Sequence, residues 1–376
     1  MPPLRPGPPY LMTEMIAAEP ALAERILARL APRDSAAAAL ASEIRAAADA
    51  GAPIVVTGCG TSEHAALGVA DILRDAMHRA GLPTSPGSPI ALQAFEASLA
   101  HRSPAGLLIG ISHEGGTAAT NAALVAARAA GTRTALLTAS GRSPGASLAD
   151  VVVATEEMDQ SWCHTVGYVS PLLAAASVGG HLAGDLPGPG AARAALASAG
   201  GDPGAAEGIA AAFVHARTII VIGSGADRTA ARELVLKLEE GTWIPSAMRD
   251  LETFLHGHLP STDDRTGLVL IAADRDQRDR RLARAREALA AASAIGVRTA
   301  AILATGLDAE LDPALTPAGR IVVAEAPELP APVAALLTTA TALQLLAERL
   351  ARAAGTNPDP IRRDDERYRR AADLAG

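Results

Sequence analysis

One short pattern constrains the fold of this 376-residue chain more than any other, because it occurs twice. Residues 52–80 read as an apolar strand, the turn Gly58-Cys59-Gly60 and a helix. Residues 217–240 repeat that order around Gly223-Ser224-Gly225. A strand that leads through a glycine turn into a helix is typical of parallel α/β sheets. The sequence therefore predicts two similar α/β halves and an internal duplication.

The rest of each half continues the alternation of apolar strands and helical segments. Near-continuous apolar strands are typical of a sheet that is covered on both faces. We therefore expect a doubly wound parallel sheet in each half. The further strands are predicted at residues 106–111, 134–138 and 151–153 in the first half, and at 267–272, 299–303 and 321–323 in the second.

Helical and glycine-rich segments divide the chain around these two sheets. The first 50 residues have helical spacing, and Pro20 is expected to start a second helix there. Residues 184–208, rich in Gly, Pro and Ala, are interpreted as a linker and a helix start. The mixed-charge run 274–286 is interpreted as a solvated helix face, and a long helix is expected over 333–353. The predicted division is residues 1–50, 51–190, 205–350 and 351–376.

Composition excludes several classes of protein. A net charge of -8 and only 2% aromatic residues argue against nucleic-acid binding. Two cysteines, Cys59 and Cys163, cannot form a disulfide framework or a multi-cysteine metal site. We expect no membrane span and no signal peptide in residues 1–10, and hence a cytoplasmic protein. We also expect neither a metal nor a cofactor.

Two loops of the first half carry hydroxyl groups where a parallel sheet binds ligands, outside the carboxyl ends of its strands. They are Gly58–Ser62 and Ser112–Thr117. Ordinary N-capping would explain one such loop, but two in one half favour an anion site at helix starts. A dinucleotide fingerprint is not expected, since its third glycine would fall at Glu63.

The helix after Gly225 places Glu233, Lys237 and Glu240 on one face. Lys237 is the only lysine among 33 basic residues, which makes it a candidate for a position that needs an ammonium. The three residues form either a surface ion-pair ladder or a charged group that faces a cleft. His256, near His258, could act as an acid or base. A third metal ligand is not evident, so zinc is not expected.

Gly-Cys-Gly-Thr-Ser62 and Ile-Ser-x-x-Gly-x-Thr117, in tandem halves, resemble the sugar isomerase (SIS) domain family. The segment 233–240, followed by His256-Gly, is similar to the isomerase part of glutamine–fructose-6-phosphate aminotransferases. Met12–Ile16 with Glu19-Pro20, and Asn357-Pro-Asp359, resemble segments at the two ends of that part. The resemblance implies two flavodoxin-like, three-layer αβα SIS domains that follow an N-terminal helical segment.

The resemblance also implies roles for particular residues. Glu240 would be the base that moves a proton between C1 and C2. Apart from the resemblance, the position of Lys237 on the same helix face would let it hold Glu240 or a ligand oxygen if that face lines a cleft. His256 would open the sugar ring, reaching the site of a partner subunit in a homodimer with shared sites. Hydroxyls would hold the phosphate. The predicted substrate-binding residues are Gly60, Thr61, Ser62, Ser112, His113, Glu114, Thr117, Ser161 and Thr165.

Four departures from the family pattern matter. The glutaminase half is absent, so glutamine-dependent amination is not expected. The basic residues of the tail are all arginines, which cannot form the family's lysine imine. Glu114 lies in the second phosphate loop, where it would repel a desolvated dianion. The stretch Ser161–Thr165 stands where the family has Ser-Thr-Lys, with Val166 in place of the lysine. There Trp162 could pack against the face of a sugar or fill the core.

These observations favour an enzyme of amino-sugar or sugar-phosphate metabolism, an aldose–ketose isomerase or an isomerase that releases ammonia. The alternative is a sugar-phosphate-binding regulator without catalysis on the same scaffold. An oxidoreductase is disfavoured by the missing third glycine.

Overall fold

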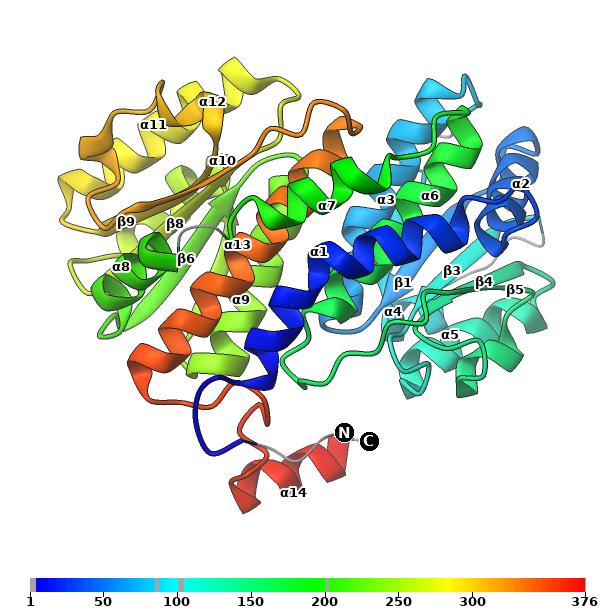
Figure 1. Ribbon diagram of the computed structural model, residues 1–376, viewed down its shortest axis with the longest axis horizontal. Helices are drawn as coiled ribbons and strands as arrows, with labels where there is room; N and C mark the ends of the chain where they lie inside the picture. The colour runs from blue at the N-terminus through cyan, green and yellow to red at the C-terminus, as the bar shows by residue number, and fades with distance from the viewer. Residues whose placement is uncertain (1–4, 85–87, 101–104, 201–202, 376) are drawn as a thin grey trace.

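The computed structural model describes residues 5–84, 88–100, 105–200 and 203–375. Within them, ten strands form two five-stranded parallel sheets, which lie side by side in Figure 1. The strand order is β2-β1-β3-β4-β5 in one sheet and β10-β9-β8-β6-β7 in the other. Since β6 to β10 are the first to fifth strands of the second half, the two orders are the same. The predicted pair of doubly wound α/β halves is confirmed.

The first half begins with two helices and continues to the buried helix α6. Its elements are α1 (Leu11–Leu30), α2 (Ala36–Asp49), β1 (Ile54–Gly58), α3 (Thr61–Arg79), β2 (Ile90–Gln93), α4 (Ala94–Leu99), β3 (Leu107–Ile111), α5 (Ala118–Ala129), β4 (Arg133–Thr138), a 3-10 turn (Pro144–Leu148), β5 (Val151–Ala154) and α6 (Val166–Ala183).

The second half repeats the plan and ends in a short tail helix. Its elements are α7 (Pro189–Ala197), α8 (Pro203–Phe213), β6 (Thr218–Gly223), α9 (Asp227–Thr242), β7 (Ser246–Asp250), α10 (Leu251–Thr253), the irregular turns Phe254–His258 and Leu259–Ser261, β8 (Thr266–Ala272), α11 (Arg278–Ala294), β9 (Arg298–Ala304), α12 (Thr305–Asp308), a 3-10 turn (Pro313–Leu315), β10 (Arg320–Val323), α13 (Ala331–Ala354) and α14 (Glu366–Ala375).

One prediction about the helices was wrong, and a second was right only in its helix start, because α8 begins at Pro203 but α7 occupies the expected linker. Pro20 does not start a helix but lies inside α1, where buried residues on both sides, such as Ile16 and Ile26, hold the helix together. The segment 184–208 contains two helices, α7 and α8, because buried alanines give each of them a face to pack. Parts of the predicted N-terminal segment, linker and tail, namely residues 1–4, 201–202 and 376, lie outside the described residues.

Helices α1 and α13 join the two halves, since each packs into both hydrophobic cores. Leu22 and Leu30 of α1 pack with the first sheet, whereas Met12 packs with the second. The N-terminal part of α13 joins the first core and its C-terminal part the second. Figure 1 shows both helices between the sheets. This packing fixes how the halves face each other.

Among the residues that the structure describes, two helices, α6 and α13, are long and apolar enough to cross a membrane by length and composition. Their most apolar windows are 89% and 83% buried within the protein, however. They are therefore core helices of the kind that soluble proteins contain. Because α6 is apolar on all sides, it has no helical period in the sequence.

Candidate functional site

A cleft of about 380 Å³ lies at the carboxyl ends of β1 and β3, where the strand order of the first sheet reverses. Ligands bind at this point in open α/β sheets. Side chains from both halves and from the tail surround it. The cleft is lined by Cys59, Gly60, Thr61, Ser62, His113, Glu114, Gly116, Thr117, Trp162, His164, Gly167, Glu240, Ile361 and Arg363.

The turn from β1 into α3 opens the first wall of the cleft. A Cβ at Gly58 would lie 2.5 Å from the carbonyl oxygen of Ser62, so only glycine lets the strand turn this tightly. Gly60 has a φ of +56°, which again favours glycine. The turn thereby places Thr61 and Ser62 in the first turn of α3, where backbone N–H groups and the helix dipole favour an anion.

The loop after β3 forms the second wall. The hydroxyl oxygens of Ser112 and Thr117 lie 3.1 Å apart, and Ser112 is buried beneath the lining residue Thr117. Glu114 is exposed and lines the cleft. Of the two predicted hydroxyl loops, Thr61, Ser62 and Thr117 therefore reach the cleft directly.

His113 supports this loop from below as a neutral ring. The backbone N–H of Asp159 donates to its Nε2 over 2.8 Å, so that nitrogen carries no proton. Burial lowers the pKa of His113 to about 4, against a smaller opposing effect of Asp159. The His164 ring lies beside it, with the ring centres 5.4 Å apart. His113 is therefore an uncharged part of the cleft near neutral pH.

Asp159 organises the segment that crosses the back of the cleft. Its buried carboxylate accepts backbone hydrogen bonds from Ser161, Thr165 and Gly167, at 3.1, 2.7 and 3.1 Å. Burial opposes ionisation, yet His164, His113 and these donors together hold the pKa of Asp159 below its ordinary value. Ser161 and Thr165, predicted to bind substrate, are fully buried and do not line the cleft, because the Asp159 carboxylate draws their backbone inward.

The second half contributes a cluster of charged residues on α9 to the cleft. Lys237 Nζ lies 2.6 Å from Oε2 of Glu240 and 3.5 Å from Oε1 of Glu233. Burial alone would lower the pKa of Lys237, but the two carboxylates outweigh it and raise the pKa. Glu240 lines the cleft, whereas Lys237 is completely buried behind it. The three residues thus form an internal cluster and not a surface ladder.

Glu233 ties this cluster to the first half. Its Oε2 lies 2.8 Å from Nδ1 of His64, and its Oε1 accepts a hydrogen bond of 3.3 Å from the Thr61 hydroxyl. Burial would raise the pKa of Glu233, but Lys237 and His64 hold it below the ordinary value. Glu233 and Lys237 were singled out from their helical spacing, whereas nothing in the sequence pointed to His64.

His256 does not reach the cleft of its own chain. It lies in the irregular turn Phe254–His258, where its side chain is 68% exposed and its Nδ1 lies 2.9 Å from the Glu252 carboxylate. Within the described residues, no group of three or more His, Cys, Asp or Glu is placed to hold a metal ion.

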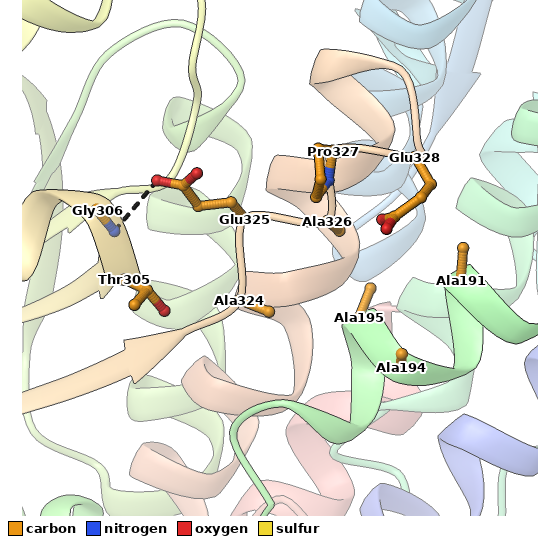
Figure 2. A pocket seen from close by; sticks show the side chains of 10 residues that line it. All are labelled: Ala191, Ala194, Ala195, Thr305, Gly306, Ala324, Glu325, Ala326, Pro327 and Glu328. Atoms are coloured by element: carbon orange, nitrogen blue, oxygen red, sulfur yellow. Dashed lines mark hydrogen bonds between the residues drawn. The ribbon is translucent and has the colours of Figure 1, made fainter.

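A second pocket, of about 750 Å³, lies between α7 and the ends of β9 and β10. Figure 2 shows the alanines of α7 on one side of it and Glu325 pointing to Gly306 on the other. Glu325 already accepts from the Gly306 N–H and pairs with Arg278. Thr305 and Glu325 are thus bound to other protein groups, and the rest of the lining apart from Glu328 is alanine, glycine and proline, so the smaller cleft is the better candidate.

A family model described as the SIS domain matches residues 48–180 and, a second time, residues 212–349. The chain belongs to the SIS domain family. Each match covers one of the two sheets, and the cleft lies at the end of the sheet in the first SIS domain. No curated protein matches the sequence.

Several solved structures share the fold of this SIS chain. The C-terminal domain of glucosamine-fructose-6-phosphate aminotransferase from Francisella tularensis has a TM-score of 0.77 at 18% identity, over 95% of this chain and 99% of that one. Tagatose-6-phosphate ketose/aldose isomerase from Escherichia coli has a TM-score of 0.71 at 20% identity, over 94% and 95%. Glucosamine-6-phosphate deaminase from Thermotoga maritima has a TM-score of 0.67 at 15% identity, over 93% and 97%.

Proposed function

We propose that this SIS protein is a cytoplasmic sugar-phosphate isomerase, either an aldose–ketose isomerase or an isomerase that also releases ammonia. One observation carries the proposal: Glu240 lines the same cleft as the hydroxyls and helix start of Thr61 and Ser62. The cleft thus combines an anion-binding wall with a carboxylate that can act as a base. The solved structures of similar fold include a ketose/aldose isomerase and a deaminase, both named for hexose 6-phosphates.

In this proposal Glu240 takes the proton from C1 or C2 of the open-chain sugar and returns it to the neighbouring carbon. The Lys237 ammonium holds Oε2 at 2.6 Å, which fixes the carboxylate and leaves Oε1 for the substrate. Lys237 is therefore a positioning residue, because it touches Glu240 and not the cleft. The N–H groups at the start of α3 and the Ser62 and Thr117 hydroxyls hold the phosphate.

Ring opening is assigned to His256 of a second copy of the chain, in a homodimer with shared sites. The exposed His256 side chain and its distance from the lining set motivate this assignment. Mixed dimers test it, because His256→Ala and Glu240→Gln chains would each lack one group. We expect such mixtures to recover part of the wild-type activity. No recovery after confirmed subunit exchange would show that each chain builds its own site.

A turnover assay on a panel tests the function itself. Glucosamine 6-phosphate, fructose 6-phosphate, glucose 6-phosphate and tagatose 6-phosphate are incubated with the protein, and sugar products and ammonia are measured. We expect at least one phosphorylated sugar to be converted, with ammonia released only from an amino sugar. Binding without conversion of any of them would favour the alternative, a regulator that senses sugar phosphates. The arginine-only tail and Glu114 are the features that favour this alternative.

A further inference from the structure

The C-terminal tail is a built part of the cleft. The Asp359 carboxylate accepts the backbone N–H groups of Leu11 and Met12, at 2.8 and 2.9 Å, and so caps the start of α1. The carbonyl of Asp359 accepts the Trp162 N–H at 3.1 Å. These bonds hold the tail against the segment that crosses the back of the cleft.

Beyond Asp359, a turn directs two successive arginines to different places. Ile361 and Arg362 have φ of +43° and +64°, which is unusual for residues other than glycine and most unusual for a β-branched one. The Arg362 guanidinium lies over Trp243, 4.3 Å from the ring centre. The Arg363 guanidinium lies over Trp162, 4.9 Å from the ring centre, and lines the cleft. Strained backbone of this kind persists where the surrounding structure imposes it, often at ligand sites.

The charged side chains around the cleft suggest what Arg363 does there. Glu240 is paired with Lys237, whose ammonium also lies near Glu233. Glu114 lines the cleft and makes no hydrogen bond or ion pair within the described part of the chain. Among the described lining residues, Arg363 is the one lysine or arginine. Without it, a sugar phosphate would meet the Glu114 carboxylate with only hydroxyls and N–H groups to offset the repulsion.

We propose that Arg363 is the specificity residue that makes this cleft accept an anionic sugar, by binding the phosphate group and offsetting Glu114. This inference rests on the proposed function for the identity of the sugar but not for the anion. A planar guanidinium binds phosphate through two parallel hydrogen bonds, which an ammonium cannot reproduce. Stacking on Trp162 holds that plane in place before the ligand arrives.

The test uses inorganic phosphate and the pair fructose 6-phosphate and fructose, with the full-length wild type, Arg363→Ala, Arg363→Lys and the matched control Arg362→Ala. We expect phosphate to raise the melting temperature of wild type and of Arg362→Ala, but not of Arg363→Ala. For fructose 6-phosphate we expect Arg363→Ala to weaken binding at least tenfold, with Arg363→Lys between the two. A phosphate effect equal in wild type and Arg363→Ala, including no effect in either, overturns the proposal.

A double-mutant cycle with Glu114→Gln separates a charge effect from a packing effect. If Arg363 offsets Glu114, the Glu114→Gln change should recover part of the phosphate affinity that Arg363→Ala loses. Losses that simply add would contradict the offsetting role. The outcome differs from failure of the proposed function, because a protein that converts no sugar would still show the phosphate effect through Arg363.

Discussion

The two halves share one topology, yet the same point of each sheet is used in opposite ways. In the first half the carboxyl ends of β1 and β3 border an open cleft. In the second half, acidic side chains that follow β6 and β8 bond the backbone groups at the corresponding strand ends. There the Asp274 carboxylate accepts the N–H of Ala226 at the start of α9, at 2.9 Å, and Asp274 also pairs with Arg281 at 2.5 Å. A carboxylate of the chain itself thus occupies the anion position.

Strand register shows which residues correspond. Val56 pairs with Ile109 in the first sheet, and Val221 pairs with Val269 in the second. Five residues after these partners come Glu114 and Asp274 respectively.

Six residues after Val56 and Val221 come Ser62 and Asp227, which therefore correspond. The buried Asp227 carboxylate accepts the backbone N–H groups of Ala273 and Asp274 at 3.1 to 3.2 Å. In the first half Ser62 makes no such hydrogen bond to the backbone N–H groups of His113 and Glu114 within the described residues. A Gly-x-Gly turn at a helix start can therefore bind a ligand only where the chain's own side chains do not already bond the N–H groups around it.

The second half nonetheless contributes to the cleft through the buried charge cluster on α9. Removing the ammonium of that cluster should have the largest effect. Lys237→Met leaves Glu233 buried without its ammonium, which should cost about 3–5 kcal/mol of unfolding free energy. Urea unfolding measures it. Arg284→Ala, which breaks only partly exposed pairs with Glu252 and Glu287, should lower the unfolding free energy far less. Equal losses in both variants would mean that the buried cluster is no more important than a surface pair.

Giving the first half the side chain of the second should close the cleft. Ser62→Asp lets a carboxylate reach the N–H groups of His113 and Glu114, as Asp227 does for its own loop. We expect affinity for fructose 6-phosphate to fall by about 100-fold, or ~2.7 kcal/mol, with the fold retained. Calorimetry on Ser62→Asp and on the control Ser62→Ala measures this. Unchanged binding by Ser62→Asp would show that the ligand does not use this helix start.

His113 gives the first half a pH dependence that the second half, with Ala273 at the corresponding position, does not have. The folded pKa of about 4 lies below the ordinary 6.5, so unfolding takes up a proton between these values. The stabilisation that comes from the neutral His113 ring is complete above pH 6.5 and is lost as the pH falls to 4. This contribution of His113 to the unfolding free energy amounts to about 3 kcal/mol. In His113→Gln, which can still accept the Asp159 N–H, the pH profile of unfolding should flatten. Parallel profiles would contradict a neutral buried imidazole.

Opening the second half should have the smallest effect. Asp274→Ala removes the carboxylate that caps α9 and should cost about 1 kcal/mol of stability. Turnover should stay within about twofold of wild type, because α9 keeps Glu240 in place. Differential scanning calorimetry and the turnover assay measure the two quantities. A loss of turnover much larger than the loss of stability would mean that the second half holds a functional site of its own.

The sequence predicted the sheets because their central strands are apolar throughout and turn at glycines. It did not predict β2 and β7, which are short edge strands with partly exposed, mixed residues. Nor did it predict α6, since a helix buried on every side shows no period.

The same limit applies to the site. The hydroxyl loops and the face of α9 follow from local spacing, so Thr61, Ser62, Thr117, Lys237 and Glu240 could be selected. Asp159, His64 and Arg363 take part through contacts between segments that are distant in the chain. Such contacts depend on how α1, α9 and the tail pack, and no local pattern encodes them.

The most direct test of the account is whether Glu240 moves the proton in the first-half cleft. Wild type, Glu240→Gln and the control Glu239→Gln, whose carboxylate is exposed and accepts from the Ser246 N–H, are compared on the best sugar phosphate of the panel. Turnover and deuterium uptake at C1 and C2 are followed by NMR in heavy water. We expect Glu240→Gln to bind the sugar normally but to lose at least ~100-fold in both rates, whereas Glu239→Gln keeps them. Equal rates in Glu240→Gln and wild type would contradict this expectation.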